Sequence, residues 1–321
     1  MQPRRSGSSG LSVSPVGLGT MTWGRDTDRH EAADLMRLFL DAGGSLLDTA
    51  SSDGSGAAEE VVGDLLSGEI SRREVVLCGK SGVRHGAEGI SISAARGALL
   101  DDLDATLARL RTDHLDLWLV QAPDGVTPAE ETVSALCDAV RSGRTRYVGL
   151  ANHAGWETAQ RAVLARQAGV PLAAAQVEYS LLQRGAEREV IPAAQGLGLG
   201  VIGWSGLGRG VLTGKYRRVR PADSRAASPH LRAFVEPYLT DDAARVVEAV
   251  ATAADGLGCT PAQVALAWAR QAPGITSVLI GPRAPGQLAQ ALEALDLVLP
   301  QQIRDVLDEV TQPALGYPER R

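Results

Sequence analysis

Eight short apolar runs recur along the chain, and a longer segment with helical spacing follows each of them. The first run is PVGLGTM (15–21). Apolar residues in these runs are nearly continuous instead of alternating with polar ones, which is typical of parallel strands that helices cover. We therefore predict an α/β fold made of a single (β/α)8 barrel over residues 1–321. The other seven runs lie at 45–50, 74–80, 115–121, 146–152, 173–179, 200–206 and 276–282.

A doubly wound sheet is the competing fold for this pattern. It requires a glycine-rich turn of the form G-x-G-x-x-G after the first strand, with a helix opening directly from it. The chain has only GLG at 17–19, followed by TMTWGRDT, so the barrel is favoured. We also expect a short N-terminal hairpin, and flexible ends at 1–10 and 314–321.

The longest irregular stretch follows the seventh run and interrupts the alternation of strands and helices. It spans 215–241 and is rich in arginine and proline. An insertion at the C-terminal face of a barrel either covers the site or forms a disordered bridge. We expect residues 216–241 to form a lid over the site.

Composition argues against several classes of function. The formal net charge is −6 and the pI is about 5.5, whereas a nucleic-acid-binding protein needs a basic face. No apolar run approaches the roughly 18 residues of a membrane span, and the start MQPRRSGSSG has no apolar core of a secretory signal. Cys78, Cys137 and Cys259 share no short spacing, which indicates neither a disulfide framework nor a zinc site. We expect a cytoplasmic protein with reduced thiols.

Polar and aromatic residues stand at the ends of almost all of the runs. The C-terminal ends of barrel strands meet at one face, which carries the active site. A lone aspartate there could be only a helix N-cap, but convergence of such groups from separate strands predicts a small-molecule site. The residues are Gly19, Thr20, Met21, Asp48, Lys80, Gln121, Asn152, Gln176, Tyr179, Trp204, Ser205, Gly281 and Arg283.

Several ordered motifs resemble the aldo-keto reductase superfamily, in particular the bacterial branch related to potassium-channel β subunits. They extend from VGLGTMTWG (16–24) to IGPRAPGQLAQAL (280–292), which is nearly the whole chain. Between these ends lie LLDTASSDGSGAAEEVVG (46–63), DLWLVQAPD (116–124), YVGLANHAGWE (147–157), QVEYSLLQR (176–184) and GVIGWSGLGRGVLTGKY (200–216).

The resemblance implies a carbonyl reductase that uses NADPH and no metal. Its catalytic tetrad consists of Asp, Tyr, Lys and His, and the tyrosine hydroxyl gives a proton to the substrate oxygen. The aspartate corresponds to Asp48 and the lysine to Lys80. The tyrosine position is occupied by Asp53 and the histidine position by Gln121, so two of the four members are changed.

The change at the tyrosine position alters the expected chemistry. A carboxyl beside Lys80 should be more acidic than its reference pKa of about 3.9, which would leave Asp53 ionised and unable to donate a proton. Gln121 can donate a hydrogen bond to a carbonyl oxygen, but it cannot relay a proton. His85 and His153 follow strand ends and are considered as substitute acids.

The resemblance also implies a dinucleotide site. Trp204 would stack on the nicotinamide, Asn152 and Gln176 would hold its carboxamide, and Arg283 would meet the adenosine 2′-phosphate. An asparagine expected near the adenine is replaced by Ala291, so NADH is an alternative to NADPH. The remaining expected cofactor residues are Gly19, Thr20, Met21, Ser205, Leu207, Gly210, Lys215, Gly281 and Gln287.

Three functions remain open at this point. The first is NAD(P)H-dependent reduction of a ketone or aldehyde in a specialised small molecule, such as a natural-product intermediate, with an altered proton donor. The second is a cofactor-binding pseudoenzyme or regulatory protein. The third is a non-redox reaction such as dehydration, epimerisation or cyclisation. We expect the partner to be a small-molecule carbonyl substrate, with no nucleic acid and no membrane, and a homo-oligomer is a further expectation from related barrels.

Overall fold

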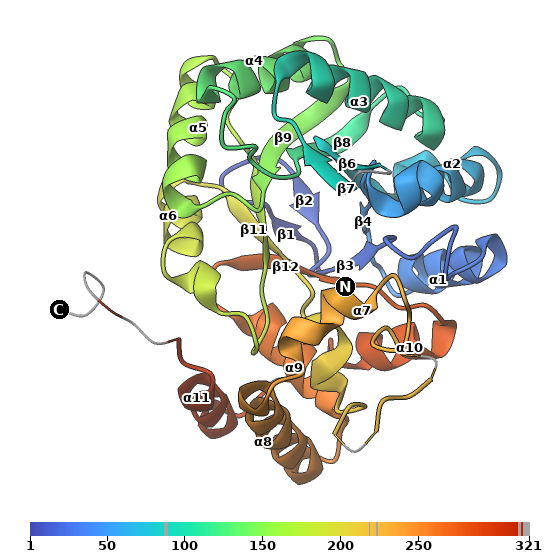
Figure 1. Ribbon diagram of the computed structural model, residues 1–321, viewed down its shortest axis with the longest axis vertical. Helices are drawn as coiled ribbons and strands as arrows, with labels where there is room; N and C mark the ends of the chain where they lie inside the picture. Colours follow the sequence, from blue (N-terminus) through green and yellow to red (C-terminus); the bar gives the residue numbers. More distant parts are fainter. Residues whose placement is uncertain (87–88, 218, 223, 314–315, 317–321) are drawn as a thin grey trace.

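A computed structural model describes residues 1–86, 89–217, 219–222, 224–313 and 316. Its centre is a closed barrel of eight parallel strands, in which the last strand pairs with the first (Figure 1). This confirms the predicted (β/α)8 fold, and each strand lies within a run identified from the sequence or extends one residue beyond it. The strands are β3 (Val16–Gly19), β4 (Leu46–Asp48), β5 (Val76–Ser81), β8 (Leu115–Val120), β9 (Thr145–Ala151), β10 (Ala174–Glu178), β11 (Gly200–Trp204) and β12 (Ile275–Ile280).

Helices surround the barrel and cover its outer face (Figure 1). Helix α1, for example, is amphipathic and buries Leu35, Met36 and Phe39. It begins at a capping box made by Asp28 and Glu31. The helices are α1 (Arg29–Asp41), α2 (Ala57–Gly68), α3 (Arg96–Leu110), α4 (Ala129–Arg141), α5 (Gly155–Gln167), α6 (Val190–Leu197), α7 (Arg232–Val235), α8 (Asp241–Leu257), α9 (Pro261–Gln271), α10 (Pro285–Glu293) and α11 (Gln301–Val310), with short 3₁₀ turns η1 (Asp53–Gly56), η2 (Arg72–Glu74), η3 (Gly185–Glu187), η4 (Gly208–Thr213) and η5 (Glu236–Tyr238).

The interior of the barrel is filled by small and medium apolar side chains. Gly17 on β3 allows this packing, because a Cβ atom there would lie 2.5 Å from the side chain of Leu279. Two of the three cysteines, Cys78 and Cys137, are buried, Cys259 is partly exposed, and all three are free thiols. Side chains of this inner cluster are Leu46, Cys78, Leu117, Leu119, Ala151, Ala174, Ile202 and Leu279.

The predicted N-terminal hairpin is present and closes one end of the barrel. Strand β1 (Arg4–Arg5) pairs antiparallel with β2 (Ser12–Val13). The hydroxyl of Ser6 donates to the carbonyl of Ala173 at 2.8 Å, and the guanidinium of Arg4 donates to the carbonyl of Arg270 at 2.9 Å. Residues 1–10 are therefore fastened to the barrel, and the expectation of a free end there is wrong. The expected end at 314–321 lies, except for residue 316, outside the described residues.

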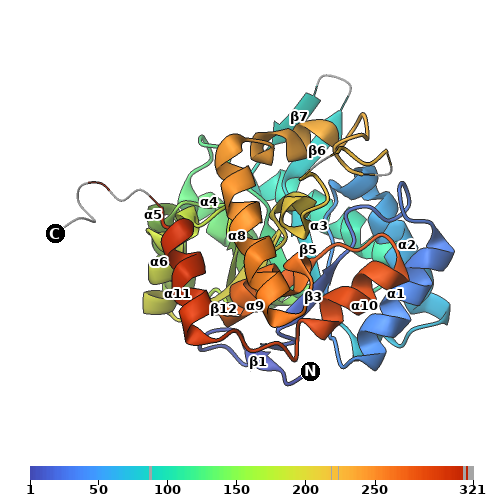
Figure 2. The same ribbon diagram turned by 90° about the horizontal axis from the view of Figure 1, so that it is seen from below.

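A second hairpin was not anticipated from the sequence. Strand β6 (Val83–Gly86) pairs with β7 (Gly89–Ile92) directly after β5. Figure 2 shows this hairpin at one end of the barrel and β1 at the other. No helix in the described part of the chain is long and apolar enough to cross a membrane.

Candidate active site

A pocket of about 660 Å³ opens at the C-terminal ends of the barrel strands. Of the residues predicted to form the site, Thr20 and Tyr179 are absent from its wall. Tyr179 is buried, and its hydroxyl donates to the carboxylate of Glu187 at 2.7 Å. Thr20 is fully buried instead, and its hydroxyl donates to the main-chain carbonyl of Asp48 at 3.2 Å. The predicted residues that do line the pocket are Gly19, Met21, Asp48, Asp53, Lys80, Gln121, Asn152, Gln176, Trp204, Ser205, Leu207, Gly210, Lys215, Gly281, Arg283 and Gln287.

A buried ion pair lies at the base of the pocket. The ammonium of Lys80, on β5, contacts a carboxylate oxygen of Asp48, at the end of β4. The other carboxylate oxygen accepts a hydrogen bond of 2.7 Å from the side-chain amide of Gln176 on β10. Burial is the largest single effect and on its own lowers the pKa of Lys80. The charges of Asp48, Cys78 and Asp53, with the hydrogen bond to Asp48, together outweigh burial, so the pKa is raised. Lys80 therefore stays protonated and cannot act as a base near neutral pH.

The turn after β4 places Asp53 at the edge of the pocket. Three successive residues in this turn have positive φ angles: Gly54 (57°), Ser55 (56°) and Gly56 (96°). Two glycines make this left-handed stretch accessible, because a residue with a Cβ atom rarely adopts it. The turn then leads directly into α2, which begins at residue 57.

The electrostatics of Asp53 differ from the sequence-based expectation. Burial raises its pKa to about 7, although Lys80 opposes the shift, and the negative charges of Asp48 and Glu59 add to it. Lys80 does lower the pKa of this carboxyl, but loss of hydration outweighs the attraction to one cation. The expectation that Asp53 would be more acidic than its reference value is therefore wrong. The protonated form of Asp53 is therefore populated near neutral pH.

Glu59 supports the same turn from within the protein and was not identified from the sequence. It is fully buried on α2, where its carboxylate accepts hydrogen bonds from Thr106 (2.9 Å) and Arg109 (2.6 Å) of α3. The side chain of Arg109 occupies the space beside Gly56, whose Cβ, if present, would be 2.8 Å from it. Arg109 and Glu59 thus fix the turn that carries Asp53.

Gln121 follows β8 and has its amide held by a neighbouring hydroxyl. Its amide nitrogen donates to Ser52 at 2.9 Å, and its main-chain carbonyl accepts from the side chain of Asn152 at 2.9 Å. Asn152 in turn accepts a 3.0 Å hydrogen bond from the indole of Trp204. The hydrogen bonds of Gln121, Asn152 and Trp204 tie the ends of β8, β9 and β11 together. The second N–H of the Gln121 amide is left for a ligand. Ser52 was not identified from the sequence.

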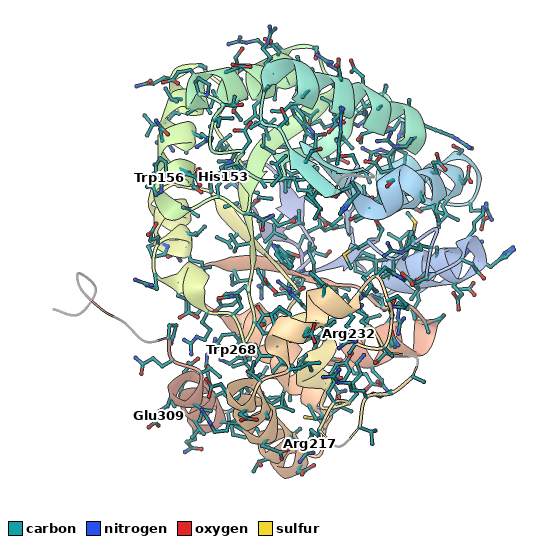
Figure 3. The ribbon with its side chains drawn as sticks, viewed as in Figure 1. His153, Trp156, Arg217, Arg232, Trp268 and Glu309 are labelled. Carbon is teal, nitrogen blue, oxygen red and sulfur yellow. The ribbon has the colours of Figure 1, made fainter. Side chains whose placement is uncertain are left out.

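Neither histidine considered as a substitute acid lies in the wall of the pocket. His85 is exposed on β6. His153 is buried beside α5 (Figure 3), and burial lowers its pKa to about 4. Its Nδ1 contacts the carbonyl of Ala151 at 2.8 Å. His153 is therefore neutral near pH 7 and has no part in the pocket wall.

The other end of the pocket is built for an anion. Ser205, Arg209 and Gly210 have positive φ angles of 57°, 57° and 94°, a backbone pattern that can turn main-chain N–H groups toward one point. Lys215 and Arg283 line the same end. Gln287 accepts from the main-chain N–H of Arg283 at 2.9 Å and so orders the start of α10.

Segment 216–241 contributes a further cation that was not identified from the sequence. Arg225 lines the pocket and donates to the carbonyl of Gly281 at 2.9 Å. Burial lowers its pKa, and the like charge of Arg283 adds to this effect. Two guanidinium groups that repel each other in a partly buried position favour a bound anion. The positive charges of Arg225 and Arg283 would suit the phosphates of a dinucleotide.

The same segment also reaches across the opening. Phe234, which belongs to α7, lines the pocket, and α7 is drawn in front of the barrel in Figure 1. His230 of the same segment contacts the carboxylate of Asp26, in the loop after β3, at 3.0 Å. Arg225 and Phe234 of this segment line the pocket, and its action as a lid stays a prediction.

Comparison with known proteins gives consistent matches over nearly the full length. The sequence model of the Aldo/keto reductase family matches residues 15–312. An uncharacterized oxidoreductase of Bacillus subtilis, YrpG, is 35% identical over 318 residues, which cover 95% of this chain and 94% of that protein. Probable voltage-gated potassium channel β subunits of Oryza sativa and Arabidopsis thaliana are each 32% identical and cover 100% of this chain and 98% of their own length.

Proposed function

Because the chain belongs to the aldo/keto reductase family of oxidoreductases, we propose that it reduces a carbonyl group with NAD(P)H and that Asp53 supplies the proton. The observation that carries the proposal is a carboxyl with a pKa of about 7 in the wall of the pocket, next to the buried pair of Lys80 and Asp48. A general acid is most effective when its pKa is close to the operating pH.

NAD(P)H, when bound, would supply the hydride that the carbonyl carbon takes up. The protonated Asp53 carboxyl gives its proton to the substrate oxygen, so that the O–H bond of the acid breaks as the O–H bond of the alcohol forms. Asp53 is left as a carboxylate, which Lys80 stabilises, and it regains a proton from water. The free N–H of the Gln121 amide donates a hydrogen bond to the oxygen while its negative charge develops. Lys80 remains protonated throughout.

The cations around the outer end of the pocket support NADPH as the preferred cofactor, with NADH as the alternative. Arg225 and Arg283 would bind the phosphates, Trp204 would meet the nicotinamide ring, and Lys215 would add positive potential. Ala291 lines the pocket at the position where the aldo/keto reductase family is expected to have an asparagine. Without that asparagine, the adenine ring would have one polar contact fewer than in the family.

Replacing Arg225 by glutamine should weaken NADPH binding about tenfold, because a charge-assisted hydrogen bond to phosphate contributes on the order of 1.5 kcal/mol. Binding of NADH should change less than threefold if the lost contact is to the 2′-phosphate. Arg217→Gln is the matched control, since Arg217 lies beside α8 (Figure 3) and pairs with Glu248 outside the pocket wall. Fluorescence titration of each variant measures the dissociation constants. Equal losses for both nucleotides would place Arg225 elsewhere on the cofactor.

Titration of the protein with NADPH and NADH, followed by tryptophan fluorescence, tests the proposed function directly. Chemical acylation gives an independent readout, because Lys80 and Lys215 are the only lysines in the sequence and both line the pocket. Lys80 is shielded by its ion pair, so acylation should occur at Lys215 and NADPH should protect it. Saturable binding without turnover of any carbonyl would favour the pseudoenzyme. No binding of either nucleotide would leave the non-redox reaction.

We also propose that the substrate is a specialised small molecule, such as a natural-product intermediate, because an altered acid suits a narrow range of carbonyls. Three unpaired thiols support a reducing, cytoplasmic location. Assembly into a homo-oligomer is a proposal that rests on related barrels alone, and size-exclusion chromatography with light scattering would decide it.

A further inference from the structure

The side chain of Arg209 lies among three aromatic rings. Its guanidinium carbon is 4.2 Å from the ring centre of Phe234, 5.0 Å from that of Tyr238 and 5.6 Å from that of Trp204. Arg209 belongs to η4 and Trp204 ends β11, whereas Phe234 and Tyr238 come from segment 216–241. We call these four residues the Arg209 cage. The cage joins the segment over the pocket to the rim of the barrel.

Hydrogen bonds fix the position of the guanidinium within the cage. It donates to both carboxylate oxygens of Glu178, at 2.7 and 2.6 Å, and to the main-chain carbonyl of Phe234 at 2.6 Å. Glu178 ends β10 and lies opposite Trp204 in the sheet register. A bidentate pair of this kind is both strong and directional. Arg209 therefore fixes the backbone of Phe234, and Glu178 neutralises its charge.

The cage places one aromatic ring against another at the pocket wall. The ring of Phe234 is inclined by 17° to the ring of Trp204, with 6.4 Å between the ring centres. Both residues line the pocket and both are partly exposed. A partly exposed aromatic face in a cavity gains free energy when a flat apolar group covers it. Since the charge of Arg209 is paired with Glu178, this part of the wall attracts an uncharged group.

We propose that Phe234, held by Arg209, determines substrate specificity and selects a carbonyl compound that carries a flat, uncharged aromatic ring. This inference rests on the proposed reductase function for its kinetic consequences, although ring binding does not require turnover. Phe234 would contact the substrate, whereas Arg209 acts through Phe234 and is a positioning residue. Specificity for this substrate class would then depend on segment 216–241 and not on the barrel alone.

The kinetic experiment compares Phe234→Leu with wild-type protein on two aldehydes at saturating NADPH. For 2-naphthaldehyde we expect KM to rise about tenfold, because the variant loses ring stacking and part of the buried apolar area. For butanal we expect KM to change less than twofold, with kcat retained. Val219→Ala is the control, since Val219 is an exposed residue of the same segment outside the pocket wall. Equal changes for both aldehydes would overturn the proposal.

A binding experiment separates this proposal from the proposed function. Equilibrium dialysis with 2-naphthamide, which is not reducible by hydride transfer here, measures ring binding without turnover, and butanamide serves as the aliphatic control. We expect wild-type protein to bind 2-naphthamide more tightly than butanamide, and Phe234→Leu to lose most of this preference. If no carbonyl is reduced but this preference is present, only the reductase function fails. If wild-type protein shows no preference, the specificity proposal fails even if reduction occurs.

The positioning role of Arg209 is tested with a double-mutant cycle. Arg209→Lys keeps the charge but cannot form the bidentate contact with Glu178, so we expect it to weaken 2-naphthamide binding about as much as Phe234→Leu. Both changes remove the same aromatic wall of the pocket. The double variant should therefore bind 2-naphthamide no more weakly than either single variant does. Additive losses would show that Arg209 does not act through Phe234 and would remove it from the proposal.

Discussion

Replacing Asp53 by asparagine is expected to lower kcat/KM for carbonyl reduction by about 10²- to 10³-fold, the usual contribution of a positioned general acid. The amide has nearly the same shape and can donate a hydrogen bond, but it cannot release a proton to the substrate oxygen. The dissociation constant for NADPH should change little, because the cations proposed to bind its phosphates, Arg225 and Arg283, are unchanged in the variant. Steady-state kinetics and fluorescence titration provide the two measurements.

The pH dependence gives the sharper form of this prediction. The pKa of Asp53 is about 7, raised from its ordinary value by burial, so the protonated form falls tenfold for each pH unit above that value. In wild-type protein, kcat/KM for reduction should therefore decline above about pH 7. Oxidation of the product alcohol needs the carboxylate and should rise over the same range. In Asp53→Asn, kcat/KM for reduction should no longer decline above about pH 7.

Asp64→Asn is the matched control for Asp53→Asn. Asp64 lies on the following helix, α2, and pairs with Arg111 outside the pocket wall. We expect this variant to keep both the wild-type rate and the wild-type pH profile. An Asp53→Asn protein with unchanged kcat/KM and an unchanged decline near pH 7 would show that another group supplies the proton.

The fold could be predicted from the sequence because its signal is repeated. Eight apolar runs separated by helical segments agree with one another, so errors at single boundaries have no effect on the architecture. The hairpin of β6 and β7 gave no such signal. Its strands have four residues each and are largely exposed, and nothing else in the pattern depends on them. The N-terminal residues were misjudged for a similar reason, since the contacts of Arg4 and Ser6 are with main-chain carbonyls distant in sequence.

The site was predictable in position but not in its electrostatics. Strand ends converge by topology, and so Asp48, Lys80 and Gln176 could be placed together from the sequence. The acidity of Asp53 depends on how much water the folded chain removes from it, and on Glu59, whose burial follows from its pairing with Arg109. Such a balance between hydration and charge cannot be read from neighbours in the sequence.

Residues supplied by segment 216–241 were the hardest to anticipate. Arg225 and Phe234 lie in an irregular stretch with no periodicity to indicate which side chains face the pocket. Arg209 could be seen within a motif, yet its partners come from β10 and from this segment. In each case the role is set by a contact between distant parts of the chain, for which one sequence holds no local signal.

Replacing Lys80 by methionine is expected to destabilise the protein by about 3–5 kcal/mol, the usual cost of leaving a buried carboxylate without its partner. Asp48 would keep its hydrogen bond from Gln176 but would lose its cation. Reduction should also fall strongly, because Lys80 no longer stabilises the carboxylate that Asp53 becomes. Urea denaturation of wild-type and variant proteins measures the free energy of unfolding, and a loss below about 1 kcal/mol would contradict a desolvated pair.

The double variant Asp48→Asn, Lys80→Met separates loss of charge pairing from loss of packing. If the cost arises from an unpaired buried charge, removing both charges should recover most of the stability lost by Lys80→Met alone. The single variant should also differ from wild type in its pH dependence. An unpaired carboxylate takes up a proton more readily in the folded than in the unfolded state, so its penalty is small at low pH and grows as pH rises. The stability deficit of Lys80→Met relative to wild type should therefore be larger at pH 8 than at pH 5. A deficit that is the same at both pH values, and that the double variant does not reduce, would show that Lys80 contributes through packing of its aliphatic chain and not through its charge.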